Sequence, residues 1–166
     1  QIDASITAQV NVGLRQGLVQ QATRLNVAHV PLQFVEWMVP QSVAETGRIE
    51  VRFNGQLLTP EVISQSSGIN ELGPDAFVND NPESQSGVDR NKRAWRVVRV
   101  LLPSPLFGSG ELVTRYSEEM PEIPEEATVP ISIPLLLPTG AIVGRQSVTL
   151  SSVEELNVDV RDERWN

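Results

Sequence analysis

The side chains best suited to chemistry in this sequence are carboxylates, and five of them fall within nine residues. These are Glu118, Glu119, Glu122, Glu125 and Glu126. Two carboxylates at a fixed separation in a cleft serve as acid and base in glycoside hydrolysis. An acidic run broken by prolines is also typical of a solvated connection. We interpret this stretch as a surface loop and predict no catalytic residue in it.

A second group of oxygen-bearing side chains lies in the polar stretch from Ser67 to Arg93. It comprises Asp75, Asp80, Glu83 and Asp89, together with Asn79 and Asn81. Calcium takes six to eight oxygen ligands, so these residue types suit a calcium site. Their spacing does not match an EF-hand, and Asp, Asn and Pro clusters also make turns. We expect a long surface loop anchored by Phe77, with no metal and no cofactor; calcium binding is the alternative.

The cysteine, histidine and glycine content of the sequence gives little support for other kinds of catalytic site. The sequence has no cysteine and a single histidine, His29, so a thiolate nucleophile, a thiolate metal site and a His-based metal site are excluded. Gly108-Ser109-Gly110 is interpreted as a turn, because a phosphate cradle requires a helix after the glycines. We therefore predict that the chain is not an enzyme.

Charge and hydropathy exclude two classes of partner. The formal net charge is −8, which repels phosphate backbones and predicts no nucleic-acid partner. No apolar run approaches the roughly 18–20 residues that span a bilayer, so we predict no membrane insertion. The chain begins at Gln1 rather than Met, which favours a processed, exported protein. We expect an extracellular or cell-surface location, with a virion as the alternative.

The elements that would position these residues are predicted to be short strands. Alternating apolar residues indicate core strands near 49–53, 95–102, 129–137 and 156–160. Asn54-Gly55 predicts a type I′ hairpin turn. Pro31 predicts a break, an edge strand or a bulge, and Pro103 and Pro105 predict a strand end. The pattern indicates an all-β fold with little helix, an antiparallel β-sandwich or jelly roll. We divide the chain into an extended strand, 1–16, and a single β-sandwich domain, 17–166.

The N-terminal strand has the most regular pattern in the chain. Seven apolar residues alternate with polar ones: Ile2, Ala4, Ile6, Ala8, Val10, Val12 and Leu14. This period gives the strand one wholly apolar face. The strand is either the first strand of its own domain or a strand donated to the sheet of a neighbouring copy. Donation resembles the assembly of donor-strand pilins in mechanism alone, with Gly13 and Gly17 as a hinge.

The sequence favours a structural role. We predict a non-enzymatic subunit that self-assembles into a homopolymer, a pilus-like surface filament joined by the seven residues of the N-terminal strand. One alternative is a jelly-roll capsid or decoration protein of a virion. The other is a carbohydrate-binding module, in which Trp37, Trp95 or Trp165 would stack on sugar rings.

Overall fold

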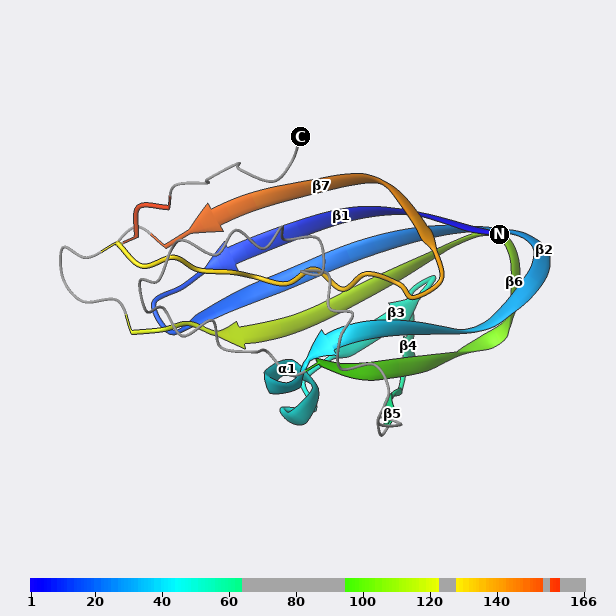
Figure 1. The fold of residues 1–166 in the computed structure, drawn as a ribbon, viewed down its shortest axis with the longest axis horizontal. Coiled ribbons are helices and arrows are strands. Elements are labelled where there is room, and N and C mark those ends of the chain that lie inside the picture. The colour runs from blue at the N-terminus through cyan, green and yellow to red at the C-terminus, as the bar shows by residue number, and fades with distance from the viewer. Residues whose placement is uncertain (64–94, 123–127, 154–155, 159–166) are drawn as a thin grey trace, which may run out of the picture.

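The computed structural model describes residues 1–63, 95–122, 128–153 and 156–158. Within them the chain forms seven strands and one short helix (Figure 1). The elements are β1 (Ile2–Val12), β2 (Gln16–Pro40), α1 (Gln41–Glu45), β3 (Glu50–Phe53), β4 (Gln56–Leu58), β5 (Pro60–Ile63), β6 (Trp95–Glu119) and β7 (Ile142–Ser152). The predicted all-β fold with little helix is confirmed.

The strands join into one sheet with the order β4-β3-β6-β2-β1-β7, and β5 pairs with β6 outside this path. Most pairs are antiparallel, but β1 and β7 run parallel. The sheet is therefore mixed: the predicted antiparallel arrangement holds for every strand pair except β1 and β7. Parallel neighbours require a long crossover, and nearly the whole chain lies between β1 and β7. The sandwich or jelly-roll arrangement stays a prediction.

The long strands β2 and β6 form a hairpin that bends in the middle. Both strands turn sharply at the end of the sheet where the N-terminus lies (Figure 1). The ladder between them shifts register after Val27 and again after Leu32, and His29 has a positive φ of 75°. The irregularity predicted near Pro31 is confirmed as a shift in the register of the ladder. The strand end predicted at Pro103 and Pro105 is wrong, because both prolines lie exposed within β6, which continues to Glu119.

The predicted hairpin over residues 49–58 is confirmed. β3 and β4 pair from Val51–Leu58 to Phe53–Gln56. Asn54 and Gly55 have φ values of 46° and 88°, the positive values that a type I′ turn requires at both central positions. The Asn54 side chain also accepts a hydrogen bond from the Glu111 backbone N–H, at 3.1 Å, which ties the turn to β6.

The segment from 129 to 137 is extended but is not a strand, so that prediction is wrong. It crosses the face of the sheet (Figure 1), and the fully buried Gln21 of β2 holds it there. Gln21 Nε2 donates to the Leu136 carbonyl at 2.6 Å, and Gln21 Oε1 accepts from the Leu136 N–H at 3.0 Å. The prolines at 130, 134 and 138 lack an N–H, which prevents a regular ladder. The predicted alternation also changes phase, since Leu136 is buried and Leu137 exposed.

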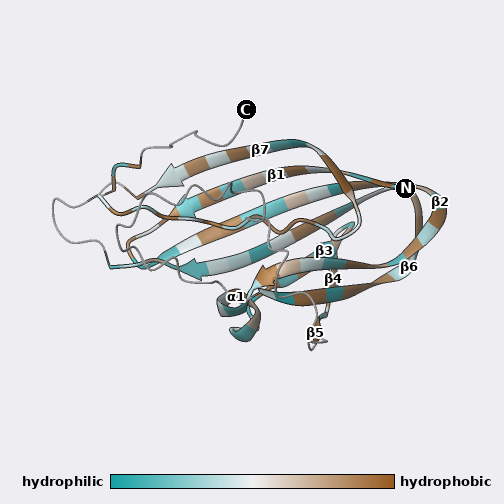
Figure 2. Ribbon diagram, viewed as in Figure 1, coloured by the Kyte–Doolittle hydropathy of each residue, from teal (hydrophilic) through white to brown (hydrophobic). Residues whose placement is uncertain are grey.

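The predicted final strand at 156–160 is also wrong in its described part. Residues 156–158 are not a strand, and the Leu156 N–H turns back to the Val153 carbonyl at 3.0 Å. The C-terminal strand of the sheet is β7 instead, which ends at Ser152. Bands of alternating hydropathy follow β1 and β2 (Figure 2), and their apolar side chains form the core together with those of β3, β6 and Leu136.

Candidate functional site

The apolar side chains of the N-terminal strand lie in the core of their own chain. Ala4, Ile6, Ala8, Val10 and Val12 are buried, and Ile2 is half-buried at the start of β1. The exception is Leu14, which lies beyond the end of β1 and is 53% exposed. Six of the seven predicted contact residues therefore occupy one continuous apolar face, and Leu14 does not.

β1 is an inner strand with a hydrogen-bonded neighbour on each edge. On one edge it pairs antiparallel with β2, in register from Ile2–Val27 to Val12–Gly17. On the other edge it pairs parallel with β7, with one irregularity between Ala4 and Ile6. Because side chains alternate between faces, a slip by one residue would bring the polar face of β1 into the core. The register of this strand is therefore strongly specified.

A short turn, residues 13–15, connects β1 to the rest of the chain. The Gly13 N–H donates to the Gln16 carbonyl at 2.9 Å, and the Met120 N–H donates to the Arg15 carbonyl at 3.0 Å. Apart from Gly13, which is half-buried, the residues of this turn are exposed. Of the two glycines of the predicted hinge, only Gly13 lies in this connection, because Gly17 is buried in β2 and pairs with Val12.

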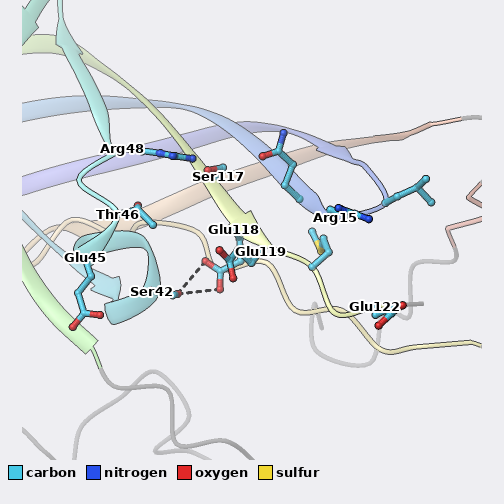
Figure 3. A pocket seen from close by; sticks show the side chains of 12 residues that line it. Arg15, Ser42, Glu45, Thr46, Arg48, Ser117, Glu118, Glu119 and Glu122 are labelled. Atoms are coloured by element: carbon cyan, nitrogen blue, oxygen red, sulfur yellow. Dashed lines mark hydrogen bonds between the residues drawn. The ribbon is translucent and has the colours of Figure 1, made fainter. Parts of the chain in front are cut away.

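An open pocket of about 930 Å³ lies beside this turn, where α1 approaches the end of β6 (Figure 3). Its ionisable lining comprises Arg15, Glu45, Arg48, Glu118, Glu119 and Glu122. Glu118 is buried, and the Ser42 hydroxyl lies 3.3 and 3.4 Å from its two carboxylate oxygens. The structure thus brings part of the predicted acidic cluster together with α1, which the sequence did not predict; Glu125 and Glu126 lie outside the described residues.

The charge of Glu118 affects a neighbour on the same strand. Tyr116 is buried, and its hydroxyl donates to the Pro134 carbonyl. Burial, together with the negative charge of Glu118, raises the pKa of Tyr116 well above its usual range. The pocket carries charges of both signs, because Arg15 and Arg48 face the same space as the glutamates. Among the described residues, no three His, Asp or Glu side chains are placed to hold a metal ion.

The other sequence candidates are dispersed. His29 is exposed at the bend of β2, Gly108-Ser109-Gly110 lies inside β6, and Trp37 is buried in the core. Trp95 is half-buried at the start of β6, whereas Trp165 and the loop from 67 to 93 lie outside the described residues. The described tryptophans therefore form no exposed stacking platform. No described helix has the length and hydropathy needed to cross a membrane.

The comparisons with known proteins place the chain in no family. No family model matches it, and no curated protein matches it. Among solved structures it is similar to the M1 zinc metallopeptidase from Deinococcus radiodurans, with a TM-score of 0.39 and 12% identity over 71% of this chain and 20% of the peptidase. It is also similar to a mutant of that peptidase bound to a Tyr-Ser-Ala substrate. The TM-score is again 0.39, and the sequence identity is 13% over 77% of this chain and 23% of the peptidase. The chain spans about a fifth of these proteins, and a likeness at this TM-score supports no argument about function.

Proposed function

We propose that the chain is a non-enzymatic structural subunit of a cell-surface homopolymer, and that β1 is the joint between copies. In the assembled form, β1 of one copy occupies the place between β2 and β7 of the next. The observation that supports this proposal is the combination of a fully paired, apolar inner strand with a single short hinge, residues 13–15.

The exchange of β1 conserves nearly all the contacts that the single chain makes. Each buried Val or Ile of β1 contributes roughly 1.5–3 kcal/mol through burial, whichever chain supplies the strand. The register with β2 and the direction along β7 also stay the same. Opening the hinge gives up the backbone bonds from Gly13 to Gln16 and from Met120 to Arg15. The exchanged and unexchanged forms therefore differ little in energy, which is the condition for strand swapping.

The exchange also links copies in an open series. Each copy donates one β1 and accepts one β1, so the contact uses two different surfaces of the chain. A contact of this kind is heterologous and continues as a filament unless its rotation closes a ring. We therefore expect linear polymers, while closed shells of uniform size would favour the virion alternative.

A cysteine pair across the β1–β2 ladder tests the exchange directly. Gln9 and Gln20 are direct partners, both side chains are exposed, and the sequence has no cysteine of its own. Direct partners in antiparallel strands have Cα atoms about 4.5–5.5 Å apart, within the range that a disulfide spans. After assembly and oxidation of Gln9→Cys/Gln20→Cys, we expect a ladder of covalent multimers on a denaturing, non-reducing gel.

The outcomes of this experiment separate the alternatives. The single variant Gln9→Cys is the matched control and cannot form a ladder, because each chain has one thiol. If assembled material contains only disulfides within single chains, β1 has not moved and the proposed joint is wrong. If the chain stays monomeric at every concentration at which it dissolves, the homopolymer proposal fails as a whole.

A further inference from the structure

The outer edge of β7 is the longest open strand edge in the described part of the chain. Within the described ranges, β7 lies at the end of the sheet and pairs there with β1 alone. The other end strand, β4, has three residues, and β5 has four. An open edge presents unpaired N–H and C=O groups that can pair with another strand. β7 is therefore the place where a further strand would extend this sheet.

Part of β7 lacks the features that usually protect an edge. The pairing with β1 is irregular between Val143 and Gln146, which sets Gly144 and Arg145 apart as a bulge. From Gln146 to Ser152 the strand pairs without a break and contains no charge, proline or glycine. Charged residues, proline and bulges are common devices against edge pairing. The seven residues from Gln146 to Ser152 have none of them.

The side chains of this stretch leave apolar surface at the margin of the core. Val148 and Leu150 pair with Ala8 and Val10 of β1, so all four lie on the core face of the sheet. Ala8 is fully buried, but Val148 is 43% exposed, and Leu150 is half-buried. The difference arises because β1 has a strand on each side and β7 has one. A strand added to β7 would complete the cover of Val148 and Leu150.

We propose that this edge binds a second copy of the chain, through antiparallel pairing of the two Gln146–Ser152 stretches about a twofold axis at Thr149. This register pairs all seven residues. It places Val148 opposite Leu150 of the second copy on the core face, and Ser147 opposite Ser151 on the polar face. Each apolar side chain therefore faces an apolar side chain of the second copy, and each of these serines faces a serine. The edge is thus complementary to itself.

This contact is separate from the exchange of β1, since it uses the other edge of a different strand and closes on two copies. A seven-residue strand pair is smaller than a standard protein interface, so we expect a weak dimer that forms at high concentration. The absence of charge in the stretch permits close approach of two chains that each carry a net charge of −8.

Single cysteines test the register. Thr149 is exposed, and it is the one residue that meets itself across the proposed axis. On oxidation, the Thr149→Cys variant should become a disulfide-linked dimer. The matched control is Ser147→Cys, two residues away on the same face, which should stay unlinked because it faces Ser151 of the other copy. Equal linking of both variants, or linking of neither, would overturn the proposal.

A charge in the apolar margin tests the same contact without a covalent bond. We expect Val148→Glu to remove the dimer in sedimentation experiments, because it places a carboxylate opposite Leu150 of the second copy. Ile142→Glu is the control, since Ile142 is 62% exposed but lies beyond the bulge. Loss of the dimer in both variants, or in neither, would contradict the assignment to Gln146–Ser152. Failure of β1 exchange leaves these results unchanged, because the two contacts use different strand edges. A single cysteine at position 149 links at most two chains, whereas the Gln9→Cys/Gln20→Cys pair would continue to higher multimers.

Discussion

At the scale of single residues, the side-chain amide of Gln21 forms the kind of backbone hydrogen bonds that a neighbouring strand would otherwise provide. Its amide group forms two hydrogen bonds with the backbone of Leu136, and a third joins it to Thr23. A side-chain amide has the same donor and acceptor as a peptide group, so it pairs with an extended backbone as a strand would. Gln21 thereby helps to hold a segment whose prolines prevent regular pairing, together with the hydrogen bond from the Tyr116 hydroxyl to the Pro134 carbonyl.

The first residue-scale prediction concerns this amide. Gln21→Leu should lower the free energy of unfolding by about 2–4 kcal/mol, because the buried N–H and C=O of Leu136 would lose their partner. Its neighbour Gln20 is exposed and faces Arg115 on the other side of the sheet, so Gln20→Leu should change stability by less than about 1 kcal/mol. Chemical denaturation of both variants measures the difference. Similar losses in the two would contradict the role assigned to Gln21.

A second residue-scale prediction concerns the pH dependence of stability. The pKa of Tyr116 is raised in the folded chain, so the folded state keeps this phenol neutral while an unfolded tyrosine ionises near pH 10. Its contribution to stability is therefore complete below about pH 10 and is lost as the pH rises above that value.

Tyr116 is the only tyrosine in the sequence, so this effect has a specific control. Between about pH 9 and about pH 11 the wild-type chain should lose more stability than Tyr116→Phe, which has no group to ionise there. The slope of unfolding free energy against pH measures this loss. Tyrosinate absorbance should rise only as the wild-type chain unfolds; ionisation in the folded chain near pH 10 would refute the prediction.

At the scale of elements, β7 depends on β1 for its place in the sheet. β1 is its one strand neighbour in the described structure, whereas β2 is held on its other edge by β6. Removal of β1 therefore leaves β7 without a hydrogen-bonded partner and leaves β2 as a sheet edge. The sheet is complete only when β1 fills the gap, whether the strand comes from the same chain or from another.

This dependence predicts the behaviour of a truncated chain. Deletion of residues 1–14 should remove hydrogen-exchange protection from β7, while the ladder between β3 and β6 keeps more of it. A peptide of residues 1–14 should restore the protection of β7, and the same peptide with Val10→Asp should not, because it would bury a charge. Protection of β7 in the truncated chain without peptide would show that β1 does not hold it.

At the scale of the whole molecule, the two proposed contacts have different symmetry. Exchange of β1 is heterologous and builds an open series, whereas pairing of β7 is isologous and closes on two copies. Exchange alone would give single filaments, and β7 pairing alone would give dimers. Both contacts together would give filaments joined side by side. Electron micrographs of the Val148→Glu variant should then show single filaments where the wild-type chain forms joined ones.

The sequence by itself determined which residues face the core along β1 and β3. The alternation from Ile2 to Val12 predicted the buried face of β1, and Asn54-Gly55 predicted the β3–β4 turn. These features are local, because strand period and turn conformation depend on neighbouring residues. The sequence also shows the carboxylates of the acidic cluster. It does not predict the burial of Glu118 against Ser42, because these residues are 76 positions apart.

The tertiary structure alone decided which segments that are distant in the sequence pair with one another. Alternation over 129–137 is the same for a strand and for an extended segment, and only the position of Gln21 shows that a side chain replaces the ladder. The prolines at 31, 103 and 105 interrupt the regular hydrogen bonding between β2 and β6. The two strands nevertheless bend together there and pair again beyond the bend. The parallel contact of β1 with β7 joins residues about 140 positions apart, and no local pattern encodes it. Pairing between distant segments depends on long-range packing, so only the folded chain shows it.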